Sequence, residues 1–156
     1  MNKRFYPAFL DIQGRRAVVI GGGAVAHRKA ISLISAGADA AVISPELSPE
    51  MERLVEDGKV SHEKRVYAEG DLSGAYIAVA ATDDQSVNEK ICAEARAMGI
   101  LINCVSPPEA GNFVVPASVT RGVLTVAVST AGRDPALAKR VRVGLESFLD
   151  DLPADE

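Results

Sequence analysis

Apolar runs alternate with helical patterns along the first two-thirds of the chain. Runs over 16–20, 38–43, 75–81 and 100–105 stay apolar throughout, whereas 60–67 alternates in polarity and predicts a more exposed strand. Between them the spacing predicts helices over 24–35, 48–58 and 84–98. Strands that alternate with helices and remain apolar on both faces are typical of a parallel sheet covered on both sides. The pattern therefore predicts an α/β fold.

The last third of the chain departs from this pattern. Strand-like runs at 113–116 and 123–129 are separated by Arg121-Gly122 without a helix, which predicts a β-hairpin or a small separate sheet. Asp134-Pro135 then begins a helix over 136–149 with one apolar stripe. A hairpin and a single amphipathic helix are too small to bury themselves, and we expect a homodimer. The predicted domains are 1–112 and 113–156.

Composition narrows the class of protein. The 156 residues carry a net charge of −4 and only 4% aromatic residues without Trp, which argues against nucleic acid as a partner. Cys92 and Cys104 lack metal-ligand spacing and are interpreted as core residues of a reduced, cytoplasmic protein. His27 and His62 are assigned structural or surface roles, so no metal site is predicted. No apolar run approaches the ~20 residues of a membrane span.

A glycine cluster follows the first predicted strand and opens directly into a helix. Gly21 would turn the chain out of the strand, and Gly23 would let the backbone approach a phosphate. Ala26 takes the third position of this pattern, where a small residue packs helix against strand. The N–H groups at the helix start, including those near Ala24 and Val25, favour an anion. This arrangement predicts a Rossmann-like sheet that binds the pyrophosphate of a dinucleotide.

The ends of two further strands bear on which dinucleotide binds. The second strand ends in Ser44-Pro45-Glu46, where Glu46 could reach the adenosine ribose and no basic residue follows. We therefore predict NAD rather than NADP. At the end of the fourth predicted strand, Ala81 gives clearance and Thr82 can donate a hydrogen bond. Thr82 or Asp83 could equally cap the following helix, and both roles can coexist.

Several motifs together resemble one enzyme family. They are FYPAFLDI at 5–12, GGGAVA at 21–26 with Arg28-Lys29, AATDD at 80–84 with Asn88, NCV at 103–105, FVVPA at 113–117, and VAVSTAG at 126–132 with Asp134-Pro135. In this order they resemble the precorrin-2 dehydrogenase module of siroheme synthases. The resemblance covers nearly the whole chain. It implies NAD-dependent oxidation of precorrin-2 to sirohydrochlorin and a homodimer formed through residues 113–132.

The polycarboxylate substrate implied by the resemblance calls for basic residues. Arg121 and Arg133 flank the hairpin, and we predict that they bind the substrate. The alternative is that the basic residues of this region are charges exposed to solvent. Thr130 lies where family members often carry a hydroxyl that faces the active site. Alternatively, Thr130 is a turn residue at the end of a strand.

One position departs from the family pattern. Some members of the family also insert Fe²⁺ into the product. The family pattern carries an acidic residue after the fifth strand, which is associated with acid–base catalysis and with metal insertion. This chain has Ser106 at that position. Holding Fe²⁺ and accepting pyrrole protons suit a carboxylate or imidazole better than a hydroxyl. Glu109, Asp83 or Asp84 could substitute, yet ferrochelatase activity is not expected. Ser106 and Thr130 are the candidate catalytic residues, and a non-catalytic NAD-binding sensor is the alternative function.

Overall fold

The computed structural model describes residues 5–150, which form two compact units. One unit spans Pro7–Phe113, and the other contains the described residues on either side of it, 5–6 and 114–150. In the described part of the chain, no helix is both long and apolar enough to cross a membrane.

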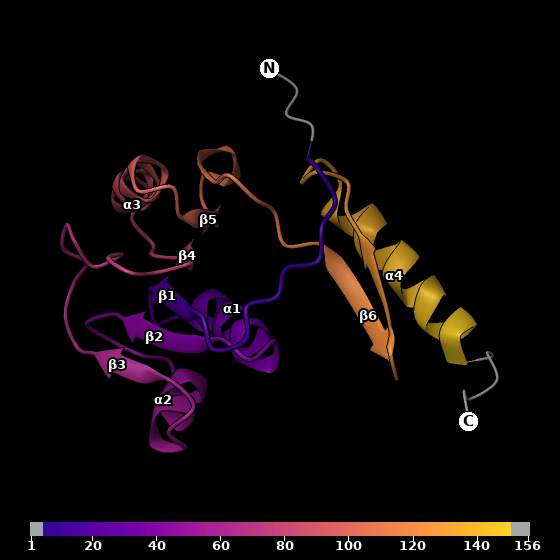
Figure 1. Ribbon diagram of the computed structural model, residues 1–156, viewed down its shortest axis with the longest axis horizontal. Coiled ribbons are helices and arrows are strands. Elements are labelled where there is room, and N and C mark those ends of the chain that lie inside the picture. Colours follow the sequence, from indigo (N-terminus) through magenta and orange to yellow (C-terminus); the bar gives the residue numbers. More distant parts are fainter. Residues whose placement is uncertain (1–4, 151–156) are drawn as a thin grey trace. The chain divides into compact units, whose positions relative to one another are not determined.

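The larger unit is built on a five-stranded parallel sheet in the order β3-β2-β1-β4-β5 (Figure 1). The strands are β1 (Arg16–Ile20), β2 (Asp39–Ile43), β3 (Ser61–Glu63), β4 (Ile77–Ala80) and β5 (Leu101–Cys104). The central residue Val18 pairs with Ala41 of β2 and Ala78 of β4. The strand order reverses between β1 and β4, and ligands of such sheets bind beyond the carboxyl ends of the strands at that point.

Helices cover both faces of this sheet, as the sequence predicts. Alternate residues of β1 enter two separate cores: Ala17 and Val19 join one, and Val18 and Ile20 the other. Helices α1 (Ala24–Ser35) and α2 (Pro49–Glu56) contribute to the first core, and α3 (Gln85–Ala97) contributes to the second. The Rossmann-like α/β fold is thereby confirmed.

Side-chain caps fix where the helices begin. The Ser48 hydroxyl accepts a hydrogen bond from the Met51 N–H at 3.3 Å, with Pro49 in the first turn of α2. The cap of α3 is Asp84, whose carboxylate accepts from the Ser86 N–H at 2.8 Å. The expectation that Thr82 or Asp83 caps this helix was wrong, because the chain enters helical geometry one residue later.

The third strand is shorter than predicted. Only Ser61–Glu63 pairs with β2, and the chain then leaves the sheet. Beyond this point the guanidinium of Arg65 donates to Glu63 and to Asp71, and these bonds link the end of β3 to the following connection. The connection from 64 to 76 contains turns and no helix.

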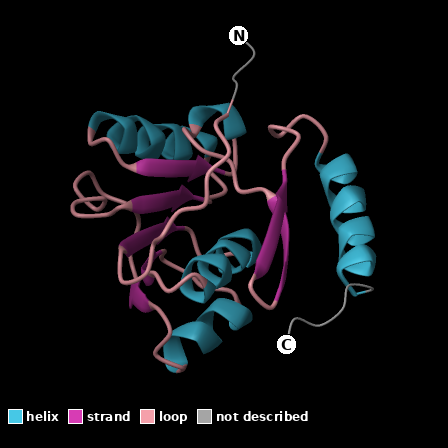
Figure 2. Cartoon of the chain, turned by 45° about the vertical axis from the view of Figure 1, so that its right-hand side comes forward, coloured by secondary structure: helices cyan, strands magenta, loops and turns pink. Residues whose placement is uncertain are grey.

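The smaller unit consists of a hairpin and one helix, both visible in Figure 2. Strands β6 (Ala117–Arg121) and β7 (Leu124–Val128) are antiparallel, and α4 (Pro135–Asp150) packs on them. The predicted strand at 113–116 was wrong. Phe113 belongs to the larger unit, where its carbonyl accepts from the Asn103 side chain at 3.3 Å, and Pro116 has no N–H with which to extend a ladder.

Much of the apolar stripe of α4 is uncovered within the described chain. Leu149 is only 2% exposed, but Phe148 is 59% exposed and Val141 41%. On the hairpin, Val123 is 95% exposed.

Candidate functional site

A large groove opens at the carboxyl ends of β1, β2 and β4. Its volume is about 1390 Å³, above the about 300–1,000 Å³ of ordinary small-molecule sites, so it admits an extended ligand. Most of the predicted cofactor contacts line it, namely Gly21, Gly23, Ser44, Pro45, Glu46, Ala81 and Thr82. Ala24 and Val25 do not line the groove but are the first two residues of α1, directly after the glycine turn.

The three glycines of the turn differ in what constrains them. Gly21 has φ +120°, and a Cβ there would lie 2.3 Å from the carbonyl oxygen of Ala81. A Cβ at Gly22 would lie 2.0 Å from the carbonyl oxygen of Glu46. A Cβ at Gly23 would meet nothing within 4 Å. The protein itself therefore requires Gly21 and Gly22, whereas Gly23 leaves space into which a ligand could fit.

The start of α1 is suited to an anion. Gly23 is its N-cap and provides no side-chain hydrogen bond, and the first turn contains no acidic residue. The first N–H groups of a helix have no intrahelical partner and carry a partial positive charge. A phosphate beside Gly23 would meet these groups without competition from a carboxylate of the same turn.

The loop after β2 is bound tightly to the glycine turn. The Ser44 hydroxyl donates to the Glu46 carbonyl at 2.7 Å, and the Ser48 N–H donates to the Gly22 carbonyl at 2.8 Å. His62 Nε2 lies 2.9 Å from the Ser44 carbonyl oxygen. Predicted phosphate and ribose contacts are thereby held in one fixed arrangement. The side chain of Glu46 remains exposed along the groove.

Asn88 links the groove to the segment after β5, a role that sequence reasoning did not assign. It is completely buried on α3. Its Oδ1 accepts from the Thr82 N–H at 3.0 Å and from the Thr82 hydroxyl at 2.8 Å. Its Nδ2 donates to the carbonyls of Thr82 and Ser106, both at 3.0 Å. The only sequence signal was the recurrence of Asn88 in the family motif.

The carboxylates considered as substitutes at Ser106 have different environments. Asp84 is committed to α3: the Ser86 hydroxyl and the N–H groups of Val87 and Ser86 hold the pKa of its carboxyl below the usual value. Asp83 lines the groove and is exposed. Glu109 lies in η1 (Pro108–Ala110), where its carbonyl accepts from Arg96 at 3.3 Å. Among residues 5–150, no three His, Cys, Asp or Glu side chains group in a way that could hold a metal ion.

The remaining predicted site residues belong to the smaller unit. The Thr130 hydroxyl accepts from the Asp134 N–H at 3.0 Å, just before α4. Arg121 lies 3.6 Å from the carboxylate of Asp150. The backbone N–H of Arg133 donates to the Thr130 carbonyl at 3.1 Å. The structure thus groups Thr130 and Arg133 in one turn and places Arg121 at the end of β6.

The sheet order, the glycine turn and the groove define a dinucleotide-binding domain. Residues 8–117 match a family described as putative NAD(P)-binding, and the chain belongs to that family. The predicted use of an NAD-type cofactor is accordingly confirmed.

Individual relatives agree with the sequence resemblance. The chain is 45% identical over 145 residues to a siroheme synthase of Chromobacterium violaceum and 42% identical over 145 residues to one of Pseudomonas aeruginosa (strain PAO1). These matches cover 93% of this chain but 31% of each relative, so the chain spans under a third of their length. A solved structure named "SirC, precorrin-2 dehydrogenase" superposes with a TM-score of 0.77 at 33% identity, covering 92% of this chain and 71% of that one. The resemblance to this enzyme family is confirmed.

Proposed function

We propose that the chain is a precorrin-2 dehydrogenase, which oxidises precorrin-2 to sirohydrochlorin with NAD⁺. The observation that supports this proposal is the groove with its glycine turn. It occurs in a chain of which 92% superposes on a solved precorrin-2 dehydrogenase. Bound NAD⁺ supplies the hydride acceptor, and the second hydrogen leaves the substrate as a proton. The protein's contribution is to hold the macrocycle and the nicotinamide in contact.

The cofactor contacts follow from the groove. The pyrophosphate would lie beside Gly23 at the N–H groups of Ala24 and Val25, with Gly21 shaping the turn. Ser44, Pro45 and Glu46 would meet the adenosine ribose. Ala81 and Thr82 would form the wall at the end of β4, and Asn88 would keep Thr82 in place.

Charge favours NAD over NADP. Five carboxylates line the groove, those of Glu46, Glu69, Asp83, Asp84 and Glu94, against one ammonium, that of Lys90. An additional phosphate at the ribose would meet the carboxylate of Glu46 rather than an arginine.

The substrate and partner assignments concern the smaller unit. Arg133, with Thr130 beside it, and Arg121 at the end of β6 would bind carboxylates of precorrin-2. We assign residues 1–112 to cofactor binding and 113–156 to dimerisation, a functional division that departs from the two compact units at residues 5–6 and at Phe113. Residues 1–4 and 151–156 lie outside the described residues. The exposed Val123 on the hairpin supports a homodimer. Free, buried Cys92 and Cys104 are compatible with the reducing cytoplasm as the compartment.

Iron insertion is not part of this proposal. Ser106 occupies the position where the family carries a carboxylate, and Asp84 is already engaged in capping α3. Sirohydrochlorin would therefore be the product rather than an intermediate. Added Fe²⁺ is expected to leave the product spectrum unchanged.

The deciding experiment mixes the purified protein with enzymatically generated precorrin-2 and NAD⁺, anaerobically and without metal, and follows NADH absorbance. We expect NADH to appear together with the sirohydrochlorin spectrum. Gly21→Asp should abolish both signals, because its side chain would meet Ala81 and a carboxylate would face the pyrophosphate. Binding of NAD⁺ without any turnover would contradict the proposal and favour the sensor alternative.

A further inference from the structure

The second turn of α1 carries a lysine in an unfavourable position. Arg28 is exposed, but the neighbouring Lys29 is half-buried. None of the ion pairs formed among residues 5–150 includes Lys29. Burial, and then the charge of Arg28, lower the pKa of the Lys29 ammonium. A cation that has lost water without gaining a counter-ion costs free energy, and such groups are concentrated at ligand sites.

Helical periodicity places Lys29 on the flank of α1 that points away from α2. The buried residues of α1, which face the sheet, are Ala26, Ala30 and Leu33. At about 100° per residue, His27 lies on one flank of this buried stripe and Lys29 on the other. His27 interacts electrostatically with Glu50 of α2, so its flank is the one beside α2. The flank of Lys29 is therefore the opposite one.

This flank faces the half of the sheet that contains β4 and β5. The sheet order places these two strands on the side of β1 opposite to β2 and β3, and α2 follows β2 in the chain. On the α1 face, the residues just beyond the carboxyl ends of β4 and β5 are Ala81 and Val105, both partly buried against the first core. Helix α3 contacts β4 and β5 from the other face. Lys29 thus lies beside a part of the sheet that α3 leaves uncovered.

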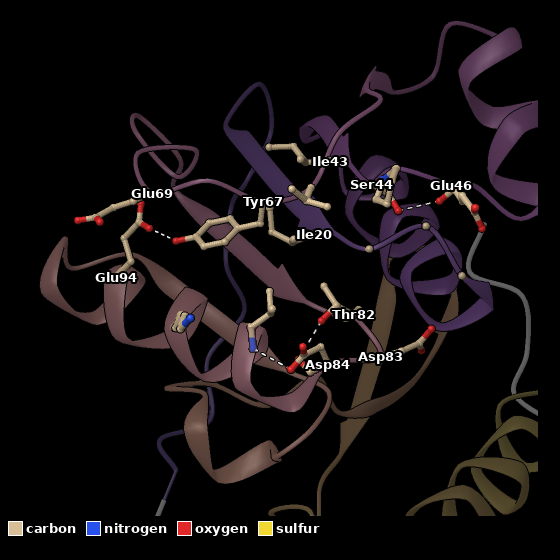
Figure 3. A pocket seen from close by; sticks show the side chains of 18 of the residues that line it. Ile20, Ile43, Ser44, Glu46, Tyr67, Glu69, Thr82, Asp83, Asp84 and Glu94 are labelled. Atoms are coloured by element: carbon tan, nitrogen blue, oxygen red, sulfur yellow. Dashed lines mark hydrogen bonds between the residues drawn. The ribbon is translucent and has the colours of Figure 1, made fainter.

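The proposed path of the cofactor leads to the same place. Figure 3 shows Ser44 and Glu46 across the groove from Thr82 and Asp83. With the adenosine ribose at Ser44 and Glu46, the nicotinamide half extends from the pyrophosphate to the other side, that of β4. Lys29 is about 8 Å along the helix axis from its first residue, and helical side chains point back toward the helix start. The ammonium therefore extends toward the carboxyl end of β4.

We infer that Lys29 binds a carboxylate of the tetrapyrrole substrate beside the nicotinamide, as a substrate contact on the larger unit. The inference rests on the proposed function, which supplies the polycarboxylate substrate. A substrate carboxylate would give the ammonium the counter-ion that the described chain does not provide, in a charge-assisted hydrogen bond. The pyrophosphate of the cofactor meets the N–H groups that precede Lys29 on α1, so it does not need this cation.

The test compares steady-state NADH formation with calorimetric NAD⁺ binding, both in the full chain. Lys29→Met removes the charge and keeps an unbranched side chain. We expect its KM for precorrin-2 to rise ~10-fold, with a smaller change in kcat and an unchanged Kd for NAD⁺. Lys29→Arg, which retains a cation, should recover most of the lost KM. In urea, Lys29→Met should unfold at the same or a higher concentration than the wild type, because an unpaired half-buried charge is removed.

Arg28→Met is the matched control, since it removes the adjacent cation from the exposed side of the same helix and should keep the KM of the wild type. An unchanged KM in Lys29→Met would overturn the inference. So would a ~10-fold weaker Kd for NAD⁺, which would assign the ammonium to the cofactor, or a lower urea midpoint, which would assign it to the fold. All three results leave the proposed function intact, because the wild type still oxidises precorrin-2. If the wild type produced no NADH from precorrin-2, the proposed function would fall, and this contact with it.

Discussion

At the residue scale, adjacent glycines in one turn are required for different reasons. The G-x-G-x-x-A pattern draws attention to Gly21 and Gly23, but Gly22 is also restricted, because a Cβ there would meet the Glu46 carbonyl. The pattern cannot reveal this, because the constraint comes from a loop that follows a different strand. Gly23 is the opposite case, since nothing in the protein opposes a side chain there.

This contrast predicts opposite outcomes for two identical substitutions. Gly22→Ala should lower the free energy of unfolding by about 1–3 kcal/mol, because backbone atoms must move to accommodate the methyl group. Gly23→Ala should change the free energy of unfolding by less than about 1 kcal/mol, because restriction of the unfolded chain offsets the poorer N-cap, yet it should weaken NAD⁺ binding by filling space beside the helix start. Urea denaturation and calorimetry measure the two effects. Loss of stability in Gly23→Ala with unchanged NAD⁺ affinity would contradict this assignment.

Asn88 supports a second prediction at this scale. Asn88→Asp keeps the oxygen that accepts from Thr82 but replaces the amide that donates to the carbonyls of Thr82 and Ser106. A buried oxygen facing two carbonyls should cost about 2–4 kcal/mol of unfolding free energy. Thr82→Val, which removes one hydroxyl and keeps the backbone bonds, should cost less. Equal stability of the two variants in urea would show that the donated bonds contribute nothing.

At the scale of elements, the sequence predicted what local chemistry determines. The strand at β1, the helix α1 and the Ser48-Pro49 start of α2 follow from periodicity and capping, and the structure has them. The part of the groove that runs along α3 could not be predicted, because it depends on the absence of a helix between 64 and 76 and on a distant pair, Tyr67 and Glu94. The same limit applies at 113–116, where a strand-like run is instead held by Asn103.

The 64–76 connection predicts a pH dependence. Hydrogen bonds from Arg65, and then from the Ala68 N–H, lower the pKa of the Asp71 carboxyl. A lowered pKa contributes stability that is present above the ordinary aspartate value of about 3.9 and is lost as pH falls through the lower folded-state value. Urea denaturation of the wild type should therefore show stability falling below about pH 4, and Asp71→Asn should be less stable at pH 7 with a flatter acid dependence. Asp57→Asn is the control, since its pair with Lys59 is exposed and contributes little.

At the scale of the whole molecule, the groove and the surface proposed for self-association lie on different units. Every residue that lines the groove lies between Ile20 and Met98, inside the larger unit. The exposed apolar side chains of the hairpin and of α4 lie in the smaller unit. A change that prevents association should therefore leave NAD⁺ binding unaffected. It should still reduce turnover if the proposed substrate residues Arg121 and Arg133 act only within a dimer.

Val123→Glu tests this separation. Val123 is 95% exposed at the hairpin turn, so a charge there cannot disturb the fold of the unit itself but would be buried in a dimer formed through residues 113–132. Light scattering should give twice 16.4 kDa for the wild type and 16.4 kDa for the variant. NAD⁺ affinity should match the wild type, and precorrin-2 oxidation should fall ~10-fold or more, as expected when a charge is buried without a partner. Ile31→Glu on α1 of the larger unit, at a 39% exposed side chain outside the groove, is the control and should remain dimeric, and Val143→Glu tests the apolar side chains of α4. If Val143→Glu dissociates the protein and Val123→Glu does not, the dimer forms through α4 and the hairpin assignment is wrong.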